Sequence, residues 1–125
     1  MQIAHHSLMS LERIEGDLVG EVRLSPIEAK VFLLVTTQGR MDASQIASSL
    51  GITHDDALGV AKRLVLLGGF IDMTETSFEA MHPRFTAVNM YRKMCARENI
   101  EFKKNLIVDN IGVALERHYE RARTK

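Results

Sequence analysis

The most apolar helical segment of the chain begins after residue 25 and has no polar face. Ser25, Pro26 and Glu28 occupy the N-cap, first and third positions expected of a capping box. Apolar side chains then occur almost all round the helix to about Gln38, which is typical of a buried central helix. Gly39 is a suitable end. The pattern predicts a buried helix over residues 26–38.

Two shorter apolar stripes at helical spacing follow. Asp42 and Thr53 are suitable N-caps, and they predict helices over residues 43–50 and 54–67. Gly51 allows a tight turn between the two helices, since glycine adopts a positive φ without steric cost. The inward stripe of the second helix comprises Ala57, Val60, Ala61, Leu64 and Leu67.

The hydrophobic period changes after Gly68 and Gly69. Residues 70–74 and 77–81 read as two short strands of a hairpin. Residues 84–121 contain no proline and a single glycine, so they read as helix, with a break near Asn99. Residues 1–24 are ambiguous: the pattern is compatible with a short helix over 8–14 and a strand over 17–24.

This order of elements is a helix-turn-helix followed by a β-hairpin wing. We therefore expect a mainly α fold with a small hairpin, a winged helix-turn-helix with long C-terminal helices. The expected organisation is an N-terminal extension over 1–23, the winged helix-turn-helix domain over 24–83, and a C-terminal helical dimerisation extension over 84–125.

Three segments resemble the archaeal TrmB family of transcriptional regulators. Residues 24–34, LSPIEAKVFLL, look like its opening helix; residues 44–52, SQIASSLGI, resemble its second helix and turn; and residues 63–71, RLVLLGGFI, are similar to its entry into the wing. The resemblance implies an archaeal, dimeric, DNA-binding regulator. The chain is too short for the sugar-binding effector domain that larger members carry.

Composition fits one globular domain, and charge complicates the DNA-binding interpretation. The chain has 125 residues, of which 46% are hydrophobic and 26% charged. A single cysteine, no signal peptide pattern and no apolar span predict a soluble, cytoplasmic protein. Residues 1–81 carry 6 basic and 11 acidic side chains (−5), whereas residues 82–125 carry 10 basic and 5 acidic (+5). The basic surface that a nucleic-acid binder needs therefore lies in the C-terminal part.

The candidate DNA-binding residues are on and around the third predicted helix, whose outer side would enter a major groove. They are Arg40, Ser44, Thr53, His54, Asp55, Gly59, Lys62 and Arg63. The carboxylates of Asp55 and Asp56, which depart from the TrmB pattern, would repel phosphate. Leu58 and Leu66 are unusual on a DNA-facing surface, and the hairpin tip has no cation. A protein-interaction module in a larger assembly, with little or no DNA binding, is therefore the alternative function.

The C-terminal apolar residues are too numerous for a helix free in water, so they must pack on this chain or on a second one. We expect a homodimer. The candidate dimerisation residues are Tyr91, Cys95, Phe102, Leu106, Ile107, Ile111 and Leu115. The same part of the chain carries cations that form either a solvated face or the basic patch that the domain lacks. They are Arg92, Lys93, Arg97, Lys103 and Lys104.

The sequence offers no grouping of residues that predicts catalysis or a bound metal. His54, Asp55 and Asp56 are adjacent on a helix and point in directions about 100° apart, so they cannot chelate one ion. The other histidines are scattered, and there is no Gly-rich phosphate loop or CxxC pair. We therefore expect a non-enzymatic regulator that binds double-stranded DNA as a homodimer, with no cofactor, metal, membrane or small-molecule substrate.

Overall fold

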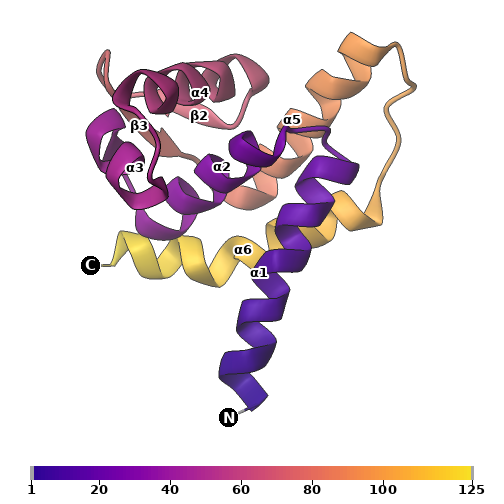
Figure 1. The fold of residues 1–125 in the computed structure, drawn as a ribbon. Helices are drawn as coiled ribbons and strands as arrows, with labels where there is room; N and C mark the ends of the chain where they lie inside the picture. Colours follow the sequence, from indigo (N-terminus) through magenta and orange to yellow (C-terminus); the bar gives the residue numbers. More distant parts are fainter. Residues whose placement is uncertain (1, 125) are drawn as a thin grey trace.

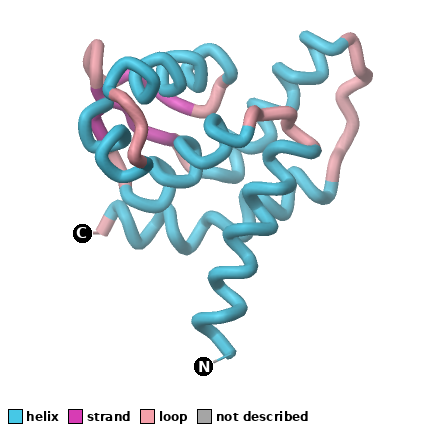
Figure 2. Tube along the Cα trace, in the orientation of Figure 1, coloured by secondary structure: helices cyan, strands magenta, loops and turns pink. Residues whose placement is uncertain are grey.

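The computed structural model describes residues 2–124, with side chains from residue 11 onward, and this part of the chain is mainly helical (Figures 1 and 2). The elements are α1 (Gln2–Gly20), α2 (Pro26–Gln38), β1 (Met41–Asp42), α3 (Ala43–Leu50), α4 (His54–Leu67), β2 (Phe70–Asp72), β3 (Ser77–Ala80), α5 (Pro83–Glu98) and α6 (Leu106–Arg123). The strands form one antiparallel sheet in the order β1-β3-β2. No helix within the described residues is both long and apolar enough to cross a bilayer.

The helices begin where side chains satisfy their first backbone N–H groups. Ser25 Oγ accepts from the Glu28 N–H, and Glu28 Oε1 accepts from the Ser25 N–H at 2.8 Å, which completes the predicted capping box of α2. A second capping box, between Asp42 and Gln45, starts α3. Thr53 caps α4. The predicted bounds of these three helices are confirmed.

The turn between α3 and α4 depends on Gly51, which has a left-handed backbone with φ 66°. The Ile52 N–H then donates to the Ala47 carbonyl at 3.1 Å and closes the turn. The predicted hairpin is also confirmed as β2 and β3, although the strands are shorter than predicted and end at Asp72 and Ala80. The sequence analysis missed β1, a strand of two residues that pairs with β3, with Met41 opposite Phe78.

Helix α2 lies at the centre of the core. Phe32, Leu64 and Phe78, from α2, α4 and β3, are all fully buried. Helix α6 crosses α2, and both α1 and α5 pack on α6 (Figure 1). The N- and C-terminal segments therefore share one core with residues 24–83.

The strand considered for residues 17–24 is wrong, because helix α1 continues to Gly20. Ile14 and Leu18 stand four residues apart on one helical face and are buried in the main core, where α1 packs on α2 and α6. The break predicted near Asn99 is confirmed. Asn99 is the left-handed C-cap of α5, and residues 99–105 connect α5 to α6.

We predict that Gly112→Ala destabilises the protein by about 1–3 kcal/mol, as overpacking of a core does. Gly112 lies where α6 meets the start of α5, and an added Cβ would stand 2.7 Å from Cα of Arg84. Gly16→Ala is the matched control, because nothing lies within 4 Å of its added Cβ in α1. It should stabilise the helix by about 0.5–1 kcal/mol. Urea denaturation of both variants measures the two free energies, and equal effects would contradict the close packing of α5 on α6.

Candidate functional site

Helix α4 buries one side and leaves the other uncovered, as the sequence predicts. Ala57, Ala61 and Leu64 are completely buried. On the opposite side the Asp55 side chain is fully exposed and Leu66 is 77% exposed. The uncovered side of α4 carries His54, Asp55, Asp56, Gly59, Lys62, Arg63 and Leu66, which we call the α4 outer face.

Arg63 is already engaged within the chain, which changes its expected role as a phosphate contact. Its Nε donates to Glu28 Oε2 at 2.7 Å, and the Glu28 side chain is only 10% exposed. Arg63 therefore neutralises a nearly buried carboxylate of α2 and ties α4 to α2. No local pattern indicates this pair, because the two residues are 35 positions apart. Lys62 is exposed and forms no ion pair or hydrogen bond within the described residues, so it is the more available cation.

The other candidate DNA-binding residues are exposed and lie beside the α4 outer face or near the hairpin. Thr53 Oγ1 accepts from the Asp56 N–H at 3.0 Å, and His54 Nδ1 lies 3.8 Å from Asp55 Oδ1. Ser44 is exposed in the first turn of α3. Arg40 Nη2 lies 3.4 Å from Ser77 Oγ at the start of β3.

A groove of about 510 Å³ runs between α4 and the hairpin. Leu58, Val65 and Leu66 form its apolar side on α4, and Phe78 contributes from β3. Asp72 and Glu75 line the hairpin side, whereas Lys62 is the cation of the lining. The groove is therefore apolar with a net acidic rim, and we call it the α4–hairpin groove.

Three of the seven candidate dimerisation residues are buried within the chain, which corrects their expected role. Cys95, Ile111 and Leu115 are at most 1% exposed, because α5 and α6 pack on each other and α6 packs on α2. Tyr91 is half-buried, and its ring lies 5.9 Å from that of Phe102. Phe102, Leu106 and Ile107 are exposed and remain available to a partner.

The exposed apolar residues continue along α6 beyond the predicted set. Val113 is 51% exposed and stands two turns after Leu106, which is 67% exposed, so both share one side of the helix. The sequence analysis did not single out Val113. We call Leu106, Ile107 and Val113 the α6 apolar stripe. Beside it, α1 and α6 enclose a groove of about 290 Å³ that Ile107 also lines, and the first half of α1 projects beyond the rest of the molecule (Figure 1).

The five cations expected to form a basic patch lie on α5 (Arg92, Lys93 and Arg97) and on the segment that follows it (Lys103 and Lys104), and none belongs to the α4 outer face. Lys104 pairs with Asp109 at 2.9 Å, and the Arg92 guanidinium lies over the Phe102 ring at 5.5 Å. Only Lys93 comes close to α4, where its side chain lies against the C-cap residue Gly68.

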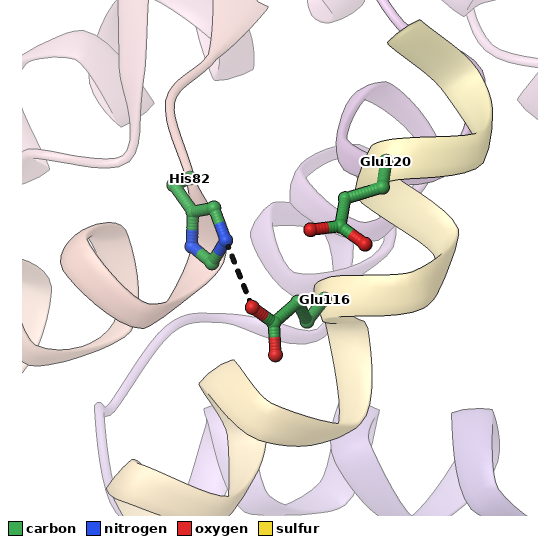
Figure 3. A group of neighbouring side chains, drawn as sticks. All are labelled: His82, Glu116 and Glu120. Carbon is green, nitrogen blue, oxygen red and sulfur yellow. Dashed lines mark ion pairs between the residues drawn. The ribbon is translucent and has the colours of Figure 1, made fainter. Parts of the chain in front are cut away.

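His82, Glu116 and Glu120 form a group that sequence spacing could not show, because α5 and α6 bring it together (Figure 3). One ligand atom from each of the three lies within 4.8 Å of the others. His82 Nε2 is 3.4 Å from Glu116 Oε2. Arg84 contributes as well, since its Nη2 and Nε donate to Glu116 Oε1 at 2.9 and 3.2 Å.

The hydrogen bonds of this group fit an ion-pair cluster better than a metal site. His82 Nδ1 accepts from the Arg84 N–H at 3.2 Å and caps α5, so the proton of a neutral ring is on Nε2. Metal-bound histidines normally donate from their other nitrogen. Binding a metal through Nε2 would therefore break the cap of α5, and the ion would compete with Arg84 for Glu116. The cluster joins the start of α5 to α6.

We predict that Glu116→Gln lowers the Tm at pH 7 and that the difference from wild type shrinks as the pH falls below about 4.5. The hydrogen bond from Arg84 and the positive charge of that residue lower the pKa of Glu116 from 4.5, although partial burial opposes the shift. A carboxylate whose pKa is lowered on folding stabilises the fold at pH values above its pKa in the unfolded chain. This stabilisation is lost as the pH falls and the carboxylate is protonated. Thermal denaturation between pH 3 and 7 measures this. Glu120→Gln, an exposed neighbour, is the control and should change little; a Glu116→Gln difference that stays constant with pH would contradict the ion pair.

The chain has no match among protein-family models, curated proteins or solved structures. Three surfaces of the molecule bear on its function: the α4 outer face, the α4–hairpin groove and the α6 apolar stripe.

Proposed function

We propose that this chain is a cytoplasmic, winged helix-turn-helix regulator of transcription that binds double-stranded DNA as a homodimer. The observation that carries the proposal is the continuous order α2–β1–α3–α4–β2–β3, in which a left-handed glycine joins α3 to α4 and the hairpin follows directly. This is the arrangement in which a second helix of the motif enters the major groove. The resemblance of residues 24–34, 44–52 and 63–71 to the archaeal TrmB family supports the same proposal.

The α4 outer face has the accessibility that groove binding needs. It is uncovered along the helix, while Ala57, Ala61 and Leu64 hold α4 on the core. In the proposed complex Lys62 contacts a phosphate, Thr53 and His54 at the helix start lie nearest the base edges, and Ser44 and Arg40 flank the backbone. Asp55 opposes this binding by repelling phosphate.

We predict that Lys62→Ala reduces the slope of log affinity against log salt by about one unit for any duplex, since each phosphate contact contributes about 0.9. Fluorescence anisotropy with a random-sequence duplex at several salt concentrations measures the slope. Lys103→Ala is the matched control, because Lys103 is an exposed lysine between α5 and α6, far from α4 (Figure 1). It should leave the slope unchanged. Asp55→Asn should strengthen binding at every salt concentration. An unaltered slope in Lys62→Ala would remove DNA contact from the role of α4.

The α6 apolar stripe supports the dimeric part of the proposal. Leu106, Ile107 and Val113 lie on one stretch of α6 with between 43% and 67% of their surface exposed. The α1–α6 groove adjoins them and is also lined by Ile14 and Ala114. A second copy seated here would bury this apolar surface, and the contact is distant from the α4 outer face (Figure 1).

We predict that Leu106→Asp weakens the homodimer by about tenfold or more, because a buried charge replaces an apolar contact. Sedimentation at micromolar concentrations should shift from twice the chain mass of 14.1 kDa towards the monomer. Leu66→Asp is the control, since Leu66 is even more exposed but lies on α4. It should leave the mass unchanged. A wild-type protein that sediments as a monomer would contradict the dimer.

A protein-interaction module is the second candidate function, and the α4–hairpin groove is the observation that favours it. Leu58 and Leu66 give α4 an apolar surface next to Asp72 and Glu75, which suits a basic amphipathic segment better than a phosphate backbone. Under this alternative wild-type protein shows no salt-dependent duplex binding, so the anisotropy experiment above distinguishes the two functions.

A further inference from the structure

A cavity lies where three segments distant in sequence meet, at the C-terminal end of α6, whereas the α6 apolar stripe lies in the first half of that helix. It has a volume of about 100 Å³ and is bounded by the last turn of α2, by β3 and by the last turns of α6. Two guanidinium groups, Arg40 and Arg123, line it together with Glu79, Tyr119 and Thr36. We call it the α2–α6 cavity. Of its lining residues, only Arg40 also has a place in the proposed DNA binding, and none belongs to the proposed dimer contact.

Thr36 is a buried polar residue that the fold leaves unsatisfied. It is 1% exposed, and its Oγ1 has no hydrogen-bond partner among the described residues. A threonine in a helix can instead bond to the carbonyl one turn back. The neighbouring Thr37 does so, donating to the Leu33 carbonyl at 2.8 Å. A buried hydroxyl without a partner requires an explanation, and a bound molecule in the cavity that Thr36 lines would provide one.

The charges around the cavity leave one cation without a counter-charge. Arg123 Nη2 donates to Glu79 Oε2 at 2.6 Å, and its guanidinium lies 4.7 Å from the centre of the Tyr119 ring. Arg40 makes only the 3.4 Å contact with the neutral Ser77 hydroxyl among the described residues. Two arginines and one glutamate therefore leave the lining with a charge of +1.

The dimensions of the cavity limit what it can hold. A water molecule takes up about 30 Å³ in the liquid, so this volume exceeds what one water needs. It is too small for a nucleotide or a sugar of the size that fills ordinary ligand pockets of about 300–1,000 Å³. Phosphate or a short carboxylate fits the size, and a guanidinium binds either through two parallel hydrogen bonds.

We infer that the α2–α6 cavity is a binding site for a small oxyanion, either phosphate or a short-chain carboxylate. Arg40 is its charge partner and the Thr36 hydroxyl donates a hydrogen bond to it. The bound oxyanion joins the segment after α2, next to β1 and β3, to the end of α6. Arg40 also flanks the DNA backbone in the proposed complex, but oxyanion binding is measured on the protein without DNA, so it can be tested whether or not the proposed function is correct.

Thermal denaturation with added sodium phosphate or sodium acetate tests the site, against sodium chloride at equal ionic strength. A ligand of the native state raises the Tm in proportion to its occupancy. We expect phosphate, acetate or both to raise the Tm beyond chloride, and the two arms distinguish the anions. Arg40→Gln, an exposed change that the fold should tolerate, should weaken oxyanion binding about tenfold or more. Arg97→Gln, an exposed arginine of α5, is the matched control and should leave binding unchanged.

Thr36→Val gives an independent measurement, because it removes the hydroxyl and keeps the shape. Without oxyanion this variant should be at least as stable as wild type, since Oγ1 has no partner to lose. With oxyanion it should gain less in Tm than wild type does. Two results would overturn the site: no increase beyond chloride with either anion, or equal increases in wild type and Arg40→Gln.

Discussion

Helix α2 has apolar side chains around almost its whole circumference, and water has to be excluded from nearly every side of it. Ala29, Val31, Phe32 and Val35 are all buried. Helices α1, α3, α4 and α6 and strand β3 all pack on α2. Burying apolar surface stabilises the folded state by about 25 cal/mol per Å², so each element that covers α2 adds to the stability of the fold. The arrangement of the terminal helices around residues 24–83 follows from this requirement.

Glu28 is the buried charged residue of α2, and its two carboxylate oxygens have different partners. One oxygen accepts from the Ser25 N–H to start the helix, and the other accepts from Arg63 of α4. A carboxylate that is nearly buried needs such partners, because desolvating an unpaired charge is costly. The pair therefore positions α4 against α2, and in doing so it takes Arg63 away from the surface charge of α4. With Arg63 paired in this way, Asp55 and Asp56 outnumber Lys62 on the α4 outer face.

Helix α6 contributes to both the α6 apolar stripe and the α2–α6 cavity. Its 18 residues extend about 27 Å. In its first three turns one side carries the α6 apolar stripe and another side is fixed in the core through Val108, Ile111 and Leu115, and the last turns close the α2–α6 cavity. A partner at one end and an oxyanion at the other would thus act on a single helix held by the core. The ion pair between Arg123 and Glu79 also joins the end of α6 to strand β3 of the hairpin.

Local sequence determined the helices over residues 26–67 and the hairpin after them, because capping residues, glycines and hydrophobic period act over a few positions. Ser25, Asp42, Thr53 and Gly51 each set a boundary without help from distant residues. Tertiary structure alone decided the extent of α1, the strand β1 and the burial of Cys95, Ile111 and Leu115, which depends on α5 and α6 packing on each other. The same holds for the Glu28–Arg63 pair, the His82 cluster and the α2–α6 cavity. Each brings together residues more than 30 positions apart, and no local pattern encodes which distant surfaces will meet.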